Sequence, residues 1–155
     1  MGLEREQISK VTPMGLDFVQ FIQGIAAKCN LNVQVKGPDL VVVPWDFGGG
    51  RLQNTFIRPM GQTGAGHLII GFFSPCMKVV TGAEVDQKTA VEFLRKNARM
   101  PHGSWAIASV QGEEYLGVQD TQIAQTMQPD EFNASAVVVA KVADDYEKQT
   151  GKDVF

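Results

Sequence analysis

The sequence predicts an α+β domain, in which an antiparallel sheet carries its helices on one face. Short turns rich in Gly, Pro and Asp join successive apolar segments, as the strands of an antiparallel sheet require. Three other segments repeat apolar residues at helical spacing. The resulting order is helix, three or four strands, helix, two strands, helix. This order is typical of a sheet with helices segregated to one side.

The first half of the chain contains one predicted helix and up to four strands. Thr12 and Pro13 suit an N-cap and a first helical turn, and apolar residues recur at helical spacing as far as Cys29. We therefore expect a helix over about 14–29. The last strand of this half is continuously apolar, so it should be buried on both faces and should end at Ser74-Pro75. The strands are predicted at residues 33–35, 40–45, 52–59 and 67–73.

The second half contains two helices on either side of a hairpin. Asp86 suits an N-cap, and Pro101 requires the helix that follows Asp86 to end by Met100. A hairpin over 104–118 turns at residues 111–113. The last helix spans about 129–149, because Pro129 suits a first turn. The residues expected to face the core are Ala90, Val91, Phe93, Leu94 and Ala98 of the middle helix, Trp105 and Ile107 of the hairpin, and Val139 of the last helix.

Length and composition indicate a single soluble domain over residues 1–155, with tails at about 1–12 and 151–155. The chain has 44% apolar residues and a net charge of −3, from 14 Lys and Arg against 17 Asp and Glu. A net acidic chain disfavours binding to nucleic acid and to anionic membranes. We find no signal peptide, lipid anchor or membrane-spanning apolar run, so a cytoplasmic location is expected. Cys29 and Cys76 should then be reduced thiols.

The sequence FLRKNARMPHGSWAI at residues 93–107 resembles the YbjN-like proteins and the type III secretion chaperone-like fold to which they belong. In that family a helix ends in an Asn-containing turn, and a hairpin then leads to a C-terminal helix with an acidic start. Residues 86–149 are similar to this pattern, and residues 14–80 agree in element order. The resemblance implies a small, non-enzymatic, usually dimeric bacterial protein that binds partner polypeptides or modulates regulation. Its secretion chaperones wrap an extended client segment around their surface.

Four residues are candidates for contact with a partner. Arg95, Arg99 and His102 collect at the C-terminal end of the middle helix, where an acidic partner or a nucleic-acid backbone could bind them. The helix dipole also accounts for cations at that position. Trp45 could stack on a peptide or a base, although tryptophans in strands are more often packing residues.

The last helix carries apolar residues on more than one stripe. Val138 and Val142 lie off the main line and are the candidate contacts of a homodimer, because a helix on one sheet needs only about 100° of apolar surface. The alternative is that the first helix covers these valines within the monomer. The main stripe consists of Phe132, Ala136, Val139, Ala143 and Tyr146.

A second hypothesis is a small-ligand or nucleotide-binding protein, or an enzyme, that uses the Gly-rich loops at 48–50 and 61–66 together with Cys76 and His67. Covalent catalysis needs a thiolate beside an imidazole, and the sequence does not place these two residues together. Phosphate loops lead into a helix, whereas a strand is expected after residue 66. With two histidines and no ligand cluster, we expect no metal, no cofactor and no catalytic residue.

Overall fold

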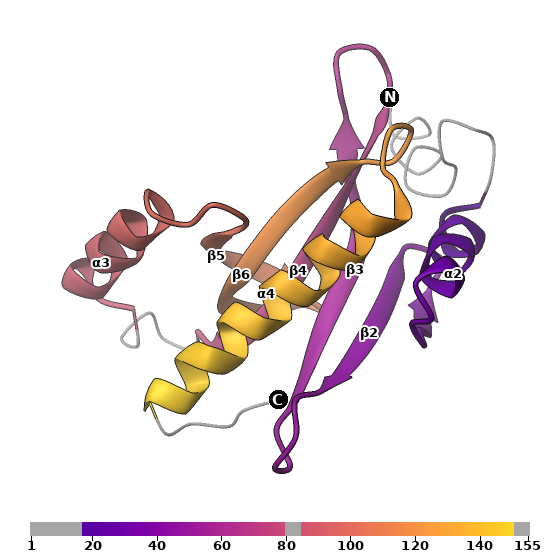
Figure 1. The fold of residues 1–155 in the computed structure, drawn as a ribbon. Helices are drawn as coiled ribbons and strands as arrows, with labels where there is room; N and C mark the ends of the chain where they lie inside the picture. Colours follow the sequence, from indigo (N-terminus) through magenta and orange to yellow (C-terminus); the bar gives the residue numbers. More distant parts are fainter. Residues whose placement is uncertain (1–16, 80–84, 151–155) are drawn as a thin grey trace.

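The computed structural model describes residues 17–79 and 85–150, which form one six-stranded sheet and three helices (Figure 1). The strand order is β1-β2-β3-β4-β6-β5, and every neighbouring pair is antiparallel. The predicted α+β class and element order are confirmed, with four strands before the middle helix. The elements are α2 (Phe18–Lys28), β1 (Gln34–Gly37), β2 (Leu40–Asp46), β3 (Leu52–Gln62), β4 (Leu68–Lys78), α3 (Gln87–Asn97), β5 (Ser104–Val110), β6 (Glu113–Ile123) and α4 (Pro129–Thr150).

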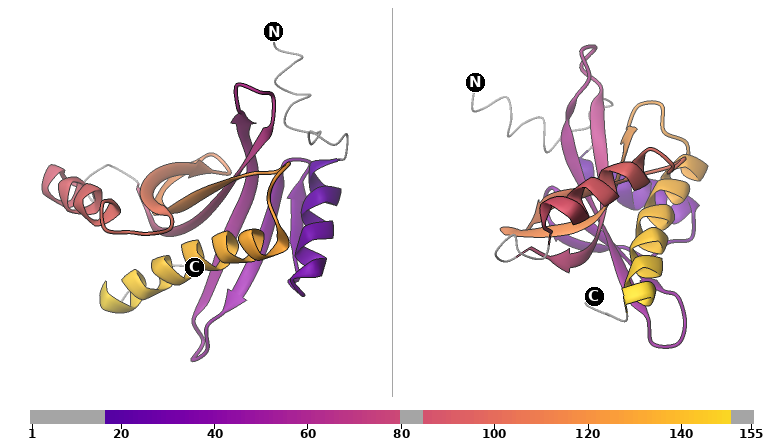
Figure 2. Two further views of the ribbon diagram at one scale, coloured as in Figure 1. Left: turned by 45° about the horizontal axis from the view of Figure 1, so that its top comes forward. Right: turned by 90° about the vertical axis from the view of Figure 1, so that its left-hand side faces the viewer.

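The helices divide one side of the sheet among them. α4 runs across β3, β4 and β6, and α2 lies beside the beginning of α4 near β2 (Figures 1 and 2). α3 lies at the opposite edge, beyond β5. The far end of α4 therefore approaches the connection between α3 and β5, and this approach shapes the site described below.

The main core lies between α4 and the central strands. The rings of Phe72 and Phe132 meet edge to face with centroids 5.6 Å apart, and both side chains are fully buried. Val139 is also fully buried, as predicted. A polar contact also crosses this layer and is satisfied, since Thr55 Oγ1 donates to the Ala136 carbonyl over 2.6 Å.

Two strands continue past the residues at which the sequence predicts that they end. β4 was expected to end at Ser74-Pro75 but continues to Lys78, and β3 continues beyond Pro59 to Gln62. Both prolines sit at irregularities, because the register shifts between Pro75 and Met77 and again between Pro59 and Gly61. A proline has no N–H for the ladder, and a bulge is where a sheet tolerates it. β4 is buried along most of its length, as predicted.

The helix ends have clear capping residues. Asp17 caps α2 by accepting hydrogen bonds from the backbone N–H groups of Val19 and Gln20. The predicted start at Thr12 and Pro13 lies outside the described residues, as do the predicted tails. Asp86 caps α3 as predicted, accepting from Thr89 N over 2.8 Å. α3 ends at Asn97, three residues before the predicted limit, and α4 matches its prediction to within one residue.

Part of the prediction of which residues of the middle helix and the hairpin face the core is wrong. Phe93 and Trp105 are buried and their ring centroids lie 4.7 Å apart, but Leu94 is 68% exposed, Ile107 48% and Val91 36%. α3 packs mainly on the edge strand β5, so much of its apolar stripe extends past the sheet. Ala98 is exposed as well. Apolar spacing shows that a helix has an apolar stripe, but not how far the sheet beneath it extends.

A smaller apolar cluster occupies the opposite sheet face. Side chains alternate along a strand, so Phe73 points away from Phe72 and α4. Val42, Phe73 and Val110 are buried there. The guanidinium of Arg58 donates to the Ser109 carbonyl and so joins β3 to the end of β5. Burial lowers the pKa of Arg58.

Among the described residues, no disulfide bond joins Cys29 and Cys76. Cys29 Sγ lies 3.2 Å from the Pro129 carbonyl, and burial is the main cause that raises the pKa of this thiol. Cys76 is buried in the main core. In residues 17–79 and 85–150, no helix has the length and apolar character needed to cross a bilayer.

Candidate functional site

A groove lies between residues 96–102 and the C-terminal half of α4. Its volume is about 420 Å³. One wall is the end of α3 with the turn that follows it, and the other wall is the face of α4 that the sheet leaves uncovered. The lining residues are Lys96, Arg99, Met100, Pro101, His102, Trp105, Val138, Val142, Asp145, Tyr146 and Gln149.

Two aromatic residues that line the groove, Trp105 and Tyr146, pack together with Phe93 behind them. Phe93, Trp105 and Tyr146 each contact the other two, with centroids 4.7 to 5.4 Å apart. Burial raises the pKa of the Tyr146 phenol above its ordinary value of 10.0, and negative charge at Cys76 and Glu92 adds to this shift. The hydroxyl therefore remains protonated at neutral pH and can donate a hydrogen bond.

The rim of the groove is cationic. The Lys96 ammonium lies 5.0 Å from the centroid of the Phe93 ring and 5.2 Å from that of Tyr146. Within residues 17–79 and 85–150, neither Lys96 nor Arg99 has a carboxylate within ion-pair distance.

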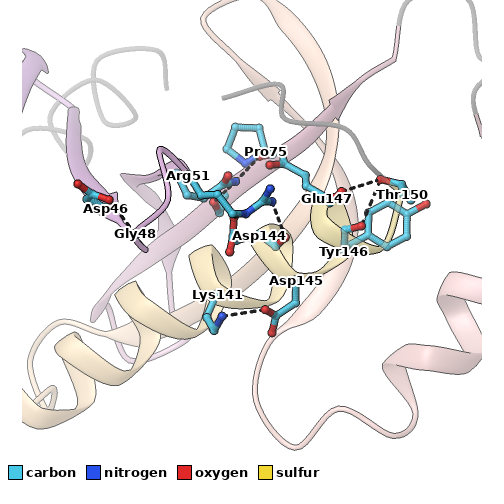
Figure 3. Close-up of polar contacts among 12 residues, drawn as sticks. Asp46, Gly48, Arg51, Pro75, Lys141, Asp144, Asp145, Tyr146, Glu147 and Thr150 are labelled. Carbon is cyan, nitrogen blue, oxygen red and sulfur yellow. Dashed lines mark hydrogen bonds and ion pairs between the residues drawn. The ribbon is translucent and has the colours of Figure 1, made fainter.

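Asp145 is the one acidic residue among the described residues that line the groove, and it forms an ion pair with a neighbouring lysine. Its Oδ1 lies 2.8 Å from Lys141 Nζ, one helical turn away on α4 (Figure 3). The neighbouring Asp144 is buried and points elsewhere, since its Oδ1 accepts from Arg51 Nε over 2.9 Å (Figure 3). The Arg51–Asp144 pair attaches the β2–β3 turn to α4 and does not change the charge of the groove.

A polar network holds His102 at the sheet side of the groove. His102 Nε2 lies 2.6 Å from Asp120 Oδ2, and Ser135 Oγ donates to the same carboxylate oxygen over 2.6 Å. Gln122 Nε2 donates to Ser135 Oγ over 3.0 Å, so strand β6 and helix α4 meet at this hydroxyl. The network fixes the turn that carries His102 against the sheet.

These residue types are those of a hydrolase triad, but the geometry differs. In a triad the histidine binds the serine through one ring nitrogen and the carboxylate through the other. Here the same Nε2 faces Asp120 at 2.6 Å and Ser135 at 3.4 Å. The Ser135 hydroxyl donates to the carboxylate and not to the imidazole, and the side chain is fully buried. This arrangement stabilises the fold and does not activate a nucleophile.

The groove brings together residues that the sequence predicts for two different roles. Val138 and Val142, the predicted dimer contacts, line it together with Arg99 and His102, two of the predicted partner contacts. Both valines are half-buried and pack against the main core. The segment 99–102, and not the first helix, is what faces them within the chain.

Two predicted partner contacts lie elsewhere. Trp45 is half-buried on β2, where its Nε1 donates to Thr55 Oγ1 over 2.9 Å and its ring stacks on Phe47. Arg95 is exposed on α3 beside Lys88 and outside the groove. The sequence prediction also missed Tyr146, which completes the site together with Lys96. Tyr146 was assigned to the core stripe, and its helical position cannot reveal that its outer edge faces α3.

The residues of the ligand-binding hypothesis are dispersed. His67 precedes β4 and Cys76 lies near its other end, so nine residues of extended chain, roughly 30 Å, separate them. The two Gly-rich loops lie at opposite ends of β3 (Figure 1). Gly48, Gly49 and Gly50 all have positive φ, and Asp46 Oδ1 accepts from Gly48 N in a local turn.

A second apolar surface borders the groove beyond Trp105. It is a hollow of about 250 Å³ between α3 and β5, and the exposed side chains of Leu94 and Ile107 lie on it. None of the described residues that line it is charged. Among the described residues, no group of three or more His, Cys, Asp or Glu side chains could hold a metal ion.

A scan against protein-family models gives no match to this chain. A search among curated proteins gives no match either.

Proposed function

We propose that this protein is a non-enzymatic, chaperone-like or regulatory module that binds a segment of a partner polypeptide in the groove between residues 96–102 and α4. The observation that carries this proposal is the composition of the groove. Its floor is apolar, from Val138, Val142 and Trp105, and its rim carries Lys96 and Arg99. An apolar centre with a polar rim is the usual anatomy of a protein-binding surface.

Apolar anchors supply most of the affinity of such surfaces, and the charged rim favours one partner over another. The groove has a volume of about 420 Å³, which is large enough for a few side chains of such a segment. The resemblance of residues 93–107 to YbjN-like proteins supports the same function, because those proteins bind polypeptides.

The proposal includes a homodimer. Leu94 and Ile107 expose large apolar side chains around the hollow between α3 and β5. A two-fold pair covers such a surface on both copies at once and is the commonest oligomer. We place the second copy there and leave Val138 and Val142, which the sequence suggests as dimer contacts, to the partner segment.

Affinity capture with matched variants tests the binding function. The baits are the wild type, Val142→Arg in the groove, and Leu52→Arg as the control, since Leu52 is 55% exposed on the sheet face away from α4. We expect polypeptides that the wild type and the control retain and that the groove variant loses. If all three baits retain the same polypeptides, the groove is not the binding site. Thermal denaturation of each bait confirms that it is folded.

A further inference from the structure

We propose that the segment bound in the groove between residues 96–102 and α4 carries carboxylates next to an apolar centre. This inference rests on the proposed function and adds the chemistry of the partner. It depends on three features of the groove: its unpaired cations, the position of Lys96, and its apolar floor.

The charge of the groove is the first step. Lys96 and Arg99 line it without an ion-pair partner in residues 17–79 and 85–150, whereas Asp145 is paired with Lys141 and His102 with Asp120. The groove is thus locally positive on a chain whose net charge is −3. A partner with carboxylates at the rim would pair these cations, and a partner with lysines there would be repelled.

The position of Lys96 is the second step. Its ammonium lies over the rings of Phe93 and Tyr146, at the boundary between the rim and the aromatic residues. A cation over aromatic faces keeps N–H groups available for hydrogen bonds. An incoming carboxylate can therefore bind Lys96 while an apolar neighbour of that carboxylate lies against Val138 and Val142.

The apolar floor of the groove favours a polypeptide ligand over a polyanion such as nucleic acid. Nucleic-acid binding draws its affinity from many phosphate contacts, and the groove offers two unpaired cations, Lys96 and Arg99. Bases would need exposed faces on which to stack, but Trp105 is only 8% exposed. Aliphatic residues form much of the remaining surface, which suits aliphatic side chains of a peptide.

The test uses three synthetic peptides with one apolar centre and with Glu, Gln or Lys flanks, and binding is followed by fluorescence anisotropy at low salt. We expect the Glu-flanked peptide to bind the wild type about tenfold more tightly than the Lys-flanked peptide. In Lys96→Glu with Arg99→Glu this order should reverse. Lys88→Glu with Arg95→Glu is the matched control, because it makes the same change of charge on exposed residues of α3 outside the groove. It should keep the wild-type order.

Several outcomes would overturn the inference. They are equal affinities for the three peptides, the same change in the order of peptide affinities in both double variants, and binding of a DNA duplex but of none of the peptides. If affinity capture shows groove-dependent polypeptides but the Glu-flanked peptide has no advantage, the charge assignment is wrong and the binding function stands. If affinity capture also fails, the function itself is wrong. Trp105 fluorescence in a Trp45→Phe background reports directly whether a peptide enters the groove, because the chain has two tryptophans.

Discussion

The side-chain amide of Asn97 pairs with the peptide groups of Trp105. Its Oδ1 accepts from Trp105 N over 2.6 Å, and its Nδ2 donates to the Trp105 carbonyl over 3.1 Å. In an antiparallel pair, the N–H and C=O of one residue point to the same side, so both groups of Trp105 point away from β6. Asn97 thus occupies the place of a neighbouring strand. Arg58 binds the carbonyl of Ser109, which lies on the same edge of β5 four residues after Trp105.

Replacing Asn97 should expose this edge. Asn97→Ala leaves two polar backbone groups next to a buried ring without partners, and we expect a loss of about 1–3 kcal/mol in the free energy of unfolding. Urea denaturation measures the loss. Asn97→Asp keeps an acceptor for Trp105 N and should lose less. Equal stability of the wild type and Asn97→Ala would show that the two hydrogen bonds contribute nothing.

Two neighbouring valines of α4 should respond very differently to a charge. Val139 is fully buried, so Val139→Asp places an unpaired carboxylate in the core and should cost about 4 kcal/mol or more. Val138 is half-buried at the groove, and Val138→Asp should cost about 1 kcal/mol, roughly half the transfer free energy of a buried valine. Thermal denaturation compares them. Similar losses would mean that α4 is rotated relative to the sheet.

The same substitution at two glycines should have opposite signs. A Cβ at Gly117 would lie 2.3 Å from the Ser74 carbonyl oxygen and 2.6 Å from Phe73 Cζ, so Gly117→Ala should destabilise the protein by about 1–3 kcal/mol. Gly24 lies in the middle of α2 with nothing within 4 Å of such a Cβ. Gly24→Ala should stabilise the protein by about 0.5–1 kcal/mol. Chemical denaturation of both variants decides, and a stable Gly117→Ala would contradict the packing of Phe73 on β6.

Asp86, the N-cap residue of α3, should have a pKa below the ordinary value for an aspartate. Hydrogen bonds from the backbone and side chain of Thr89 lower the pKa of Asp86 from its ordinary value of 3.8. Because the folded pKa is depressed, the stabilisation is fully present above pH 3.8 and is lost as the pH falls through the folded pKa. Carboxyl NMR measures the titration directly.

Asp86→Asn is the control for this prediction, since asparagine caps a helix without ionising. The stability difference between the wild type and Asp86→Asn should be constant above pH 3.8 and should shrink in stronger acid. An Asp86 pKa at or above its ordinary value would contradict the prediction.

The proposed dimer predicts a mass near twice 16.9 kDa in light scattering at micromolar concentration. Leu94→Glu with Ile107→Glu should give a folded monomer, because it places charges on the apolar hollow between α3 and β5. Val138→Lys with Val142→Lys should remain dimeric. If only the second pair gives a monomer, the interface lies at the groove, and a wild type that is monomeric at every concentration removes the dimer.

The sequence predicts the order of elements because turns and helix caps are local. Asp86 and Pro129 each mark a helix start through interactions with their nearest neighbours. The sequence predicts that β4 ends too early, at Pro75, because only the register with β6 shows that a bulge accommodates this proline. The exposure of Leu94 depends on where β5 ends the sheet, and spacing along α3 carries no such information.

The same limit applies to the site. Arg99 and His102 were identified from their position after α3, and Val142 from its place off the main stripe of α4. That they line one groove follows from the packing of α4 across the sheet, which no local pattern encodes. Lys96 gains its importance from Tyr146, a residue fifty positions away in the chain.

The walls of the groove come from segments about forty residues apart, so the groove exists only in the folded chain. A partner that binds there is bound by the native state alone, and mass action then links its concentration to the folding equilibrium. At a hundredfold excess over Kd, this linkage adds about 2.7 kcal/mol to the free energy of unfolding. The abundance of the partner would therefore set the proteolytic lifetime of this protein, since proteases act mainly on chains that have opened.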